Sequence, residues 1–191
     1  MDMRYLVSGT DIEDARALAA GLLADLPDRW AHTVTVAAQA RAVRGTVEPA
    51  DRELLVAAAW LHDVGYSGAA RDSGFHQLDG ARLLDRCGYP LRLTALVAHH
   101  SGASFVARAA QFGPELSRYP DEASVVTDAL LYADQTTGPH GEVWPASVRI
   151  EESLRRHGPE SANVKAAAER SAYLAEAVAR VQARLVGLAY V

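Results

Sequence analysis

Two otherwise apolar stretches of the sequence end in adjacent ionisable residues. The pair His62-Asp63 closes the stretch LLVAAAWLHD, and the pair His99-His100 closes the stretch LRLTALVAHH. Stretches so rich in Leu, Val and Ala are expected to be buried, and burying an unpaired carboxylate is strongly unfavourable. A cation would compensate, because imidazole beside carboxylate is a common ligand set for transition metals. These pairs therefore indicate a metal site.

Three further residues are candidate ligands on other predicted helices. His32 lies one turn before Val36, so it can face inward; His76 stands in the first turn of a helix; Asp134 shares an apolar stripe with Leu130. Each has an ordinary reading when it is taken alone. His32 could be a hydrogen-bonded core or surface histidine, His76 a capping or surface residue, and Asp134 a helix-end acid bonded to a loop. As a set, they require a shared explanation.

The elements that must position these residues are all predicted to be helices. Their expected bounds are 12–25, 28–43, 48–63, 75–87, 91–100, 121–134, 147–157 and 161–188, with a short helix and an irregular stretch in 103–120. No stretch alternates convincingly as a strand, and there is no internal repeat or low-complexity linker. We therefore expect one all-α bundle over 1–191, with a core at about 28–134 and flanking helices at 11–25 and 147–188.

The bulk composition narrows the function. The 191 residues are 49% hydrophobic and 23% charged, as in ordinary globular proteins, and the net charge of −5 disfavours an electrostatic grip on nucleic acid. No apolar run approaches the roughly 20 residues needed to span a bilayer, and no signal peptide is apparent at the N-terminus. Cys87 is the only cysteine, which excludes a cysteine-based zinc site and fits a reducing compartment. We expect a cytoplasmic protein that binds neither nucleic acid nor membrane.

The order H…HD…H…HH…D resembles the HD-domain superfamily of metal-dependent phosphohydrolases. The residues that carry the resemblance are His32 in WAHTVTVA, His62-Asp63 in WLHDVGY, His76 in FHQLDGARLL, His99-His100 in LVAHHSG and Asp134 in LYADQTTG. The matched region is about 32–134, and the flanking helices fit an HD bundle. The resemblance implies an all-α, HD-domain-like helical bundle with a mononuclear or binuclear metal site at its centre.

The resemblance also implies which residues bind the metals. The ligands of the first metal would be His32, His62, Asp63 and Asp134. Asp63 would bridge to a second metal, whose other ligands would be His76, His99 and His100. One or two divalent cations are expected, with iron or manganese favoured over magnesium, cobalt, nickel or zinc. Two close cations lower the pKa of a bridging water and bind phosphoryl oxygens, which suits phosphate ester hydrolysis.

Arginines near the His-Asp pair are candidates for holding the substrate phosphate. Arg71 stands in the glycine-rich loop GYSGAARDSG, where bidentate contact is feasible, and Arg82 is the next candidate; a solvated arginine is the ordinary reading of each. Asp79, one turn after His76, would either orient a ligand histidine or be a helix-surface acid. The predicted catalytic residues are Asp63, His76 and Arg71.

After the His-Asp pair, the sequence departs from the pattern of HD phosphohydrolases. Many HD phosphohydrolases carry a lysine shortly after the pair, whereas here Tyr66 stands at that place and Lys165 is the only lysine. The run Gly88-Tyr89-Pro90 stands in a helix-breaking turn, so we do not interpret it as the GYP motif of cyclic-di-GMP phosphodiesterases. We expect a phosphohydrolase for a small-molecule phosphate ester, with a nucleotide favoured. A di-iron oxygenase, as some relatives are, and a non-catalytic metal- or nucleotide-binding module are the alternatives, and a homodimer is left open.

Overall fold

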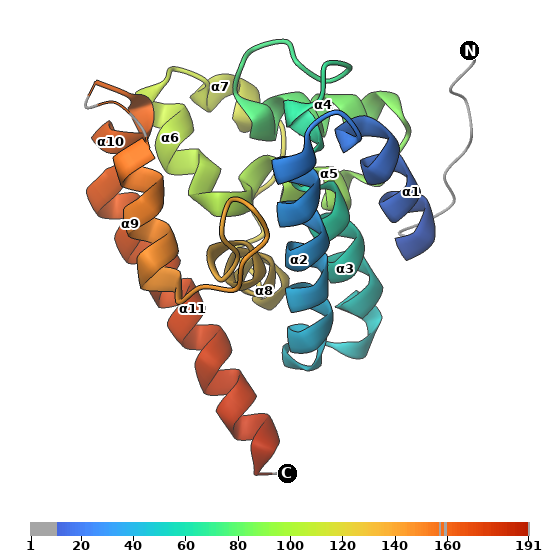
Figure 1. The fold of residues 1–191 in the computed structure, drawn as a ribbon, viewed down its shortest axis with the longest axis vertical. Coiled ribbons are helices and arrows are strands. Elements are labelled where there is room, and N and C mark those ends of the chain that lie inside the picture. Colours follow the sequence, from blue (N-terminus) through green and yellow to red (C-terminus); the bar gives the residue numbers. More distant parts are fainter. Residues whose placement is uncertain (1–10, 157, 159, 191) are drawn as a thin grey trace.

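The computed structural model describes residues 11–156, 158 and 160–190, and these form helices and loops. The α-helices are α1 (Ile12–Leu23), α2 (Pro27–Val43), α3 (Arg52–Leu61), α4 (His76–Arg86), α5 (Leu91–His99), α6 (Ala103–Ala109), α7 (Gly113–Leu116), α8 (Val125–Gln135), α9 (Ala146–Arg156), α10 (Ala162–Lys165) and α11 (Ala167–Ala189) (Figure 1). Short 3-10 turns are η1 (Arg44–Thr46), η2 (Pro49–Asp51), η3 (Val64–Tyr66) and η4 (His100–Gly102). Within the described residues the only β pairing is one isolated bridge, Thr137–Val143, so the predicted all-α class is confirmed.

Helix α3 lies at the centre of the bundle. Every residue from Leu54 to Leu61 is buried, and α3 packs against α1, α2, α5 and α8. The run Ala57–Ala59 has only methyl side chains, which lets neighbouring helices approach closely, and Trp60 stacks on Trp30 of α2 with ring centroids 5.7 Å apart. Because α3 is enclosed on all sides, the residues that follow its last turn are also delivered to the interior.

Some helix bounds differ from those that the sequence predicts. Helix α8 begins at Val125 rather than at Asp121, because the Ser124 hydroxyl accepts hydrogen bonds from the backbone N–H groups of Val126 and Thr127 and caps the helix there. The predicted final helix is divided into α10 and α11 at Ala166. Neither change moves a candidate ligand away from the end of its helix.

The last three helices cover one side of the bundle. Helix α11 packs along α8 through Leu174, Ala177 and Val181, and its C-terminal end projects beyond the rest of the bundle (Figure 1). Helices α9 and α10 pack against α11 and lie beside α8 and α6, respectively. None of the helices in the described part of the chain is both long and apolar enough to cross a bilayer. The three covering helices thus lie against α8, α6 and η4.

Candidate metal centre

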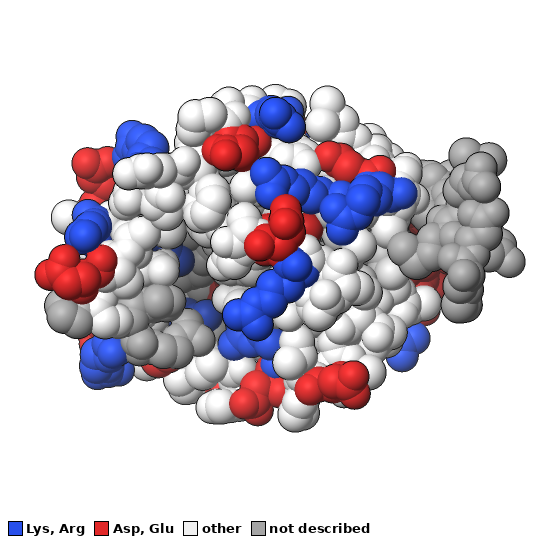
Figure 2. Space-filling model, turned by 90° about the horizontal axis from the view of Figure 1, so that it is seen from above, with Lys and Arg blue, Asp and Glu red and all other residues white. Residues whose placement is uncertain are grey.

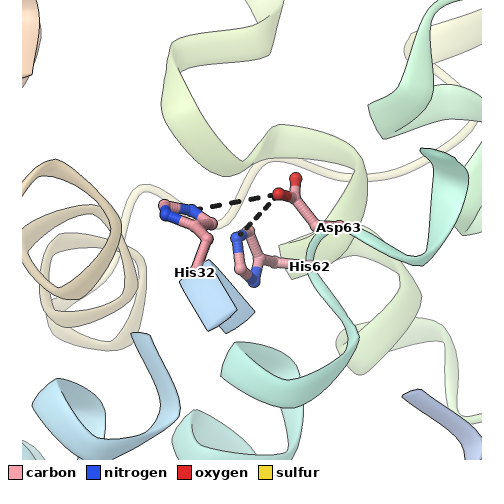
Figure 3. Close-up of side chains that lie close together, drawn as sticks. All are labelled: His32, His62 and Asp63. Carbon is pink, nitrogen blue, oxygen red and sulfur yellow. Dashed lines mark ion pairs between the residues drawn. The ribbon is translucent and has the colours of Figure 1, made fainter. Parts of the chain in front are cut away.

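Asp63 lies at the middle of a buried cluster of imidazoles. His62 and Asp63 follow the last turn of α3, and His32 reaches them from the adjacent α2 (Figure 3). The Asp63 Oδ2 atom is 3.5 Å from His62 Nε2 and 3.9 Å from His32 Nε2. His32 Nε2 is also 3.2 Å from Oδ1 of Asp134 on α8. Three helices thus bring two carboxylates and two imidazoles to one point.

The other oxygen of Asp63 faces a second pair of imidazoles. Its Oδ1 atom is 3.5 Å from His76 Nε2 and 3.6 Å from His100 Nε2, and these two nitrogens are 3.3 Å apart. The donor atoms therefore form two triads, His32–His62–Asp63 and Asp63–His76–His100, which share one carboxylate. A carboxylate with one oxygen toward each triad has the arrangement needed to bridge two cations.

Hydrogen bonds to backbone carbonyls determine which ring nitrogen carries the proton in three of these histidines. The Nδ1–H groups of His32, His62 and His100 donate to the carbonyl oxygens of Gly138 at 2.9 Å, Ala59 at 2.8 Å and Val97 at 2.6 Å. A carbonyl can only accept, so the proton of each neutral ring is on Nδ1 and the Nε2 lone pair points into the cluster. His62 Nε2 is buried and has no hydrogen-bond partner. Such a set of oriented, unfilled lone pairs fits a divalent cation.

The electrostatics of the cluster also match a metal-ligand set. Burial lowers the pKa of His62 to about 4 and that of His76 to about 3, against the opposing effect of Asp63. Burial alone would raise the pKa of Asp63, but the nearby His62, His100 and Arg29 hold it well below its usual range. His62 and His76 are thus neutral and Asp63 is ionised at neutral pH, which are the forms that bind divalent metals. Burial alone would lower the pKa of His100, but its hydrogen bond with Asp63 and the charge of that carboxylate raise it.

The structure does not bring His99 into the cluster. Its Nε2–H donates to the backbone carbonyl of Tyr119 at 2.8 Å, and its Nδ1 lies 3.6 Å from Oδ2 of Asp121. Successive residues of an α-helix point about 100° apart, so adjacent histidines at the end of α5 face different surroundings. His100 faces the metal centre, whereas His99 ties α5 to the segment that leads into α8.

A close approach of backbones brings His76 to Asp63. A Cβ atom on Gly65 would overlap the carbonyl oxygen of His76 and lie 2.7 Å from the backbone nitrogen of Gly80. Only glycine therefore lets η3 lie against the first turn of α4. This contact explains the glycine that stands two residues after the His-Asp pair.

Asp79 holds the loop that precedes His76. Its carboxylate accepts hydrogen bonds from the backbone N–H groups of Asp72, Ser73 and Gly74 and from the Ser73 hydroxyl, at 2.7–3.1 Å. Burial alone would raise the pKa of Asp79, but these hydrogen bonds lower it. Asp79 is buried, so the prediction of a helix-surface acid is wrong. Its carboxylate binds the loop backbone and does not orient a histidine ring through a hydrogen bond in the described residues.

The two arginines predicted to hold phosphate do not line the cavity into which the His-Asp cluster opens. Arg71 is exposed and lines a neighbouring pocket, which shares Arg29, Tyr66 and His76 with that cavity. Arg82 pairs with Asp72 at 3.0 Å.

Arg29 is instead the guanidinium that reaches the metal centre. Its Nη1 donates to Asp63 Oδ2 at 2.9 Å, and its Cζ lies 5.2 Å from the centroid of the Tyr66 ring. The sequence held a usable signal for Arg29, because it stands three residues before His32 and so on the same face of α2.

The metal centre forms one wall of a cavity of about 350 Å³. Helices that follow the HD-like region supply other parts of the wall, including Arg149 and Ser153 from α9, Asn163 from α10 and Arg170 from α11. The face of the molecule at the α4 and α7 end is hollowed, and Lys or Arg side chains are visible inside the hollow (Figure 2). Sequence analysis missed Arg149 and Arg170, because polar residues on amphipathic helices usually face solvent.

Comparison with known families agrees with this fold and site. A family model described as the HD domain matches residues 29–133, more than half of the chain. The chain therefore belongs to the HD domain family, which includes metal-dependent phosphohydrolases and whose members bind divalent metals. Comparisons with curated proteins and with solved structures gave no significant match.

Proposed function

We propose that this protein is a metal-dependent phosphohydrolase that cleaves a phosphate ester of a small molecule. The observation that carries the proposal is the Asp63 carboxylate, whose two oxygens face separate imidazole pairs at the wall of an arginine-lined cavity. Bound divalent cations would act as Lewis acids on phosphoryl oxygens and lower the pKa of water enough for attack near neutral pH. The expected cofactors are one or two such ions, with iron or manganese favoured.

The residues of the chain have distinct tasks in this proposal. His32, His62 and Asp134 would hold one cation and His76 and His100 would hold the other, with Asp63 as a ligand shared by both. The Nδ1–H groups of His32, His62 and His100 donate to backbone carbonyls, and these hydrogen bonds orient the three rings for metal ligation through Nε2.

Arg29 supplies the basic group that many relatives obtain from a lysine. Tyr66, at the position of that lysine, stacks on His76 with ring centroids 4.1 Å apart, and the Arg29 guanidinium lies over the same tyrosine. The planar guanidinium can contact two phosphoryl oxygens at once. We assign the contact with the substrate phosphate to Arg29 rather than to Arg71, which lines the neighbouring pocket.

The test is release of inorganic phosphate by protein loaded with manganese or iron. A panel of nucleotides, sugar phosphates and aryl phosphates is compared for the wild type, His62→Ala and His99→Gln. His62→Ala should lose metal and activity, whereas His99→Gln should keep both because His99 lies outside the cluster. If folded, metal-loaded wild type leaves the whole panel intact, the proposal is wrong. Oxygen consumption by the iron form would then favour an oxygenase, and protein isolated without metal would favour a binding module.

A further inference from the structure

We propose that Arg149 and Arg170 form a second anion-binding subsite in the same cavity, so that the substrate carries a second negatively charged group. This inference rests on the proposed phosphohydrolase function and narrows its substrate class. The preferred compounds would be phosphate esters whose remainder bears another phosphate or a carboxylate. Both arginines come from the helices that cover the bundle after the HD-matched region, residues 29–133.

Arg149 has an unfilled donor inside the molecule. Its side chain lines the cavity and is 6% exposed, and its Nη1 donates to Glu152 Oε2 at 2.6 Å. Its Nε–H is buried and has no hydrogen-bond partner. A buried N–H of a charged group without an acceptor is costly, so the position is one that a ligand oxygen would stabilise. A guanidinium has a donor geometry that matches phosphate and carboxylate oxygens.

Arg170 is held in a fixed orientation at the cavity wall. Its Nε donates to the backbone carbonyl of Ser101 at 2.8 Å and its Nη2 to the Ser101 hydroxyl at 2.9 Å. A Cβ atom on Gly102 would lie 3.3 Å from Arg170 Cγ, so glycine leaves room for the arginine stem. These contacts hold the guanidinium beside Ser101, and Arg170 lines the same cavity as Arg149.

The two anchored arginines differ from Arg29, the guanidinium that pairs with Asp63, although the charge of Arg149 also acts on Asp134. Burial alone would raise the pKa of Asp134, but His32, His62 and Arg149 hold it well below its usual range. Arg29 already pairs with Asp63, and Asp134 is engaged by His32 and by Gln135 Nε2 at 2.9 Å. The carboxylates of the centre are therefore committed to the imidazole cluster. A cavity of about 350 Å³ falls within the size range of small-molecule sites, which leaves room for more than one phosphate group. Arg149, whose Nη1 is engaged by Glu152, and Arg170, which is anchored on Ser101, thus bring two guanidinium groups to the wall of this cavity.

The experiment compares Arg149→Met, which removes the charge at similar size, with Arg149→Lys and with Arg155→Met. Arg155 lies on the same helix but is exposed and outside the cavity lining, so it is the matched control. The substrates are alkyl phosphates whose remainder is neutral, carries a carboxylate, or carries a second phosphate. Arg149→Met should lower kcat/KM for the doubly charged esters about 10-fold or more and for the neutral one less than about 3-fold. Arg149→Lys should fall between, and Arg155→Met should match the wild type.

A binding measurement separates failure of the subsite from failure of the proposed function. Calorimetric titration of the purified protein with inorganic pyrophosphate and inorganic phosphate needs no turnover. We expect Arg149→Met to weaken pyrophosphate binding about 10-fold and phosphate binding less than about 3-fold. If no ester is hydrolysed but this pattern holds, the function fails and the subsite stands. If esters are hydrolysed and the variant shows no selective loss in either assay, the subsite is wrong. If Arg149→Met does not fold, Arg149→Lys decides in the same two assays.

Discussion

Replacing Gly65 by alanine should separate the two halves of the metal centre. The new Cβ would overlap the carbonyl oxygen of His76 and lie 2.7 Å from the backbone nitrogen of Gly80. Both atoms belong to the backbone of α4, so no side chain can rotate to relieve the contact. Helix α4 must move away from η3, and it carries His76 away from Asp63. His32 and His62 lie on other helices and are not displaced directly.

The contacts set a lower limit on the displacement. The Gly80 nitrogen alone requires at least 0.3 Å, the difference between 2.7 Å and the 3.0 Å that Cβ contacts need, and the His76 oxygen requires considerably more. Overpacking of this kind costs about 1–3 kcal/mol. For a chain of this length, that lowers Tm by roughly 2–12 °C. Disturbing the support of a ligand weakens metal binding by about 10–100-fold.

The assay is metal stoichiometry and affinity alongside thermal unfolding, with Gly68→Ala as the control. Gly68 is in the same loop region, and a Cβ there would meet nothing within 4 Å. Gly65→Ala should lose one metal of two, or bind the second about 10–100-fold more weakly, while Gly68→Ala keeps the wild-type values. A Gly65→Ala protein with unchanged Tm and both metals bound at wild-type affinity would refute the role given to this glycine.

Three further changes test other parts of the structure. Asp79→Ala leaves three backbone N–H groups of the loop before His76 without their acceptor. The free energy of unfolding should therefore fall by about 1–3 kcal/mol, and protease cleavage in that loop should accelerate. Asp72→Ala is the control and should show neither effect. Asp128 is buried, which would raise its pKa, but hydrogen bonds from two arginines of α11 lower it overall. Its stabilising effect is therefore full above the unfolded pKa of about 3.9 and is lost as pH falls, so Tm should drop less between pH 5 and pH 3 in Asp128→Asn than in the wild type. Arg29→Met should lower kcat/KM for every hydrolysed ester by about 10-fold or more, whereas Arg71→Met should have a smaller effect if the phosphate contact is made by Arg29.

The all-α class could be predicted from the sequence because each main helix has a local sequence signal. Apolar spacing and the Gly and Pro residues between stretches place each of the helices that carry candidate ligands. The ends of helices were less predictable where an N-cap residue, rather than the helix propensity of its neighbours, decides where the helix begins. At α8 the acidic run from Asp121 resembles a first helical turn, yet the hydroxyl of Ser124 fixes the start at Val125. At Ala166 no residue type marks the break between α10 and α11.

The candidate site was predictable as far as its residues stand at helix ends. His32, His62, Asp63, His76, His100 and Asp134 meet as expected, while the seventh predicted ligand, His99, bonds to the Tyr119 carbonyl. Adjacent histidines cannot be told apart by spacing, because the turn that follows α5 decides which of them faces inward. The arginines of the cavity were harder still. Arg149 and Arg170 reach it only through the packing of α9 and α11, which no local pattern reports.

The position of Asp63 explains why one short motif organises the whole centre. Asp63 lies just beyond the last turn of α3, whose residues from Leu54 to Leu61 are all buried, so it is carried into the interior. Its carboxylate then meets rings from α2, α4 and the end of α5 at similar distances, 3.5–3.9 Å, and none of these distances is a short direct bond. The Asp63 carboxylate and these imidazoles are thus spaced so that a cation could lie between them. The glycine after Asp63 completes the arrangement, because it admits α4 and with it the second half of the centre.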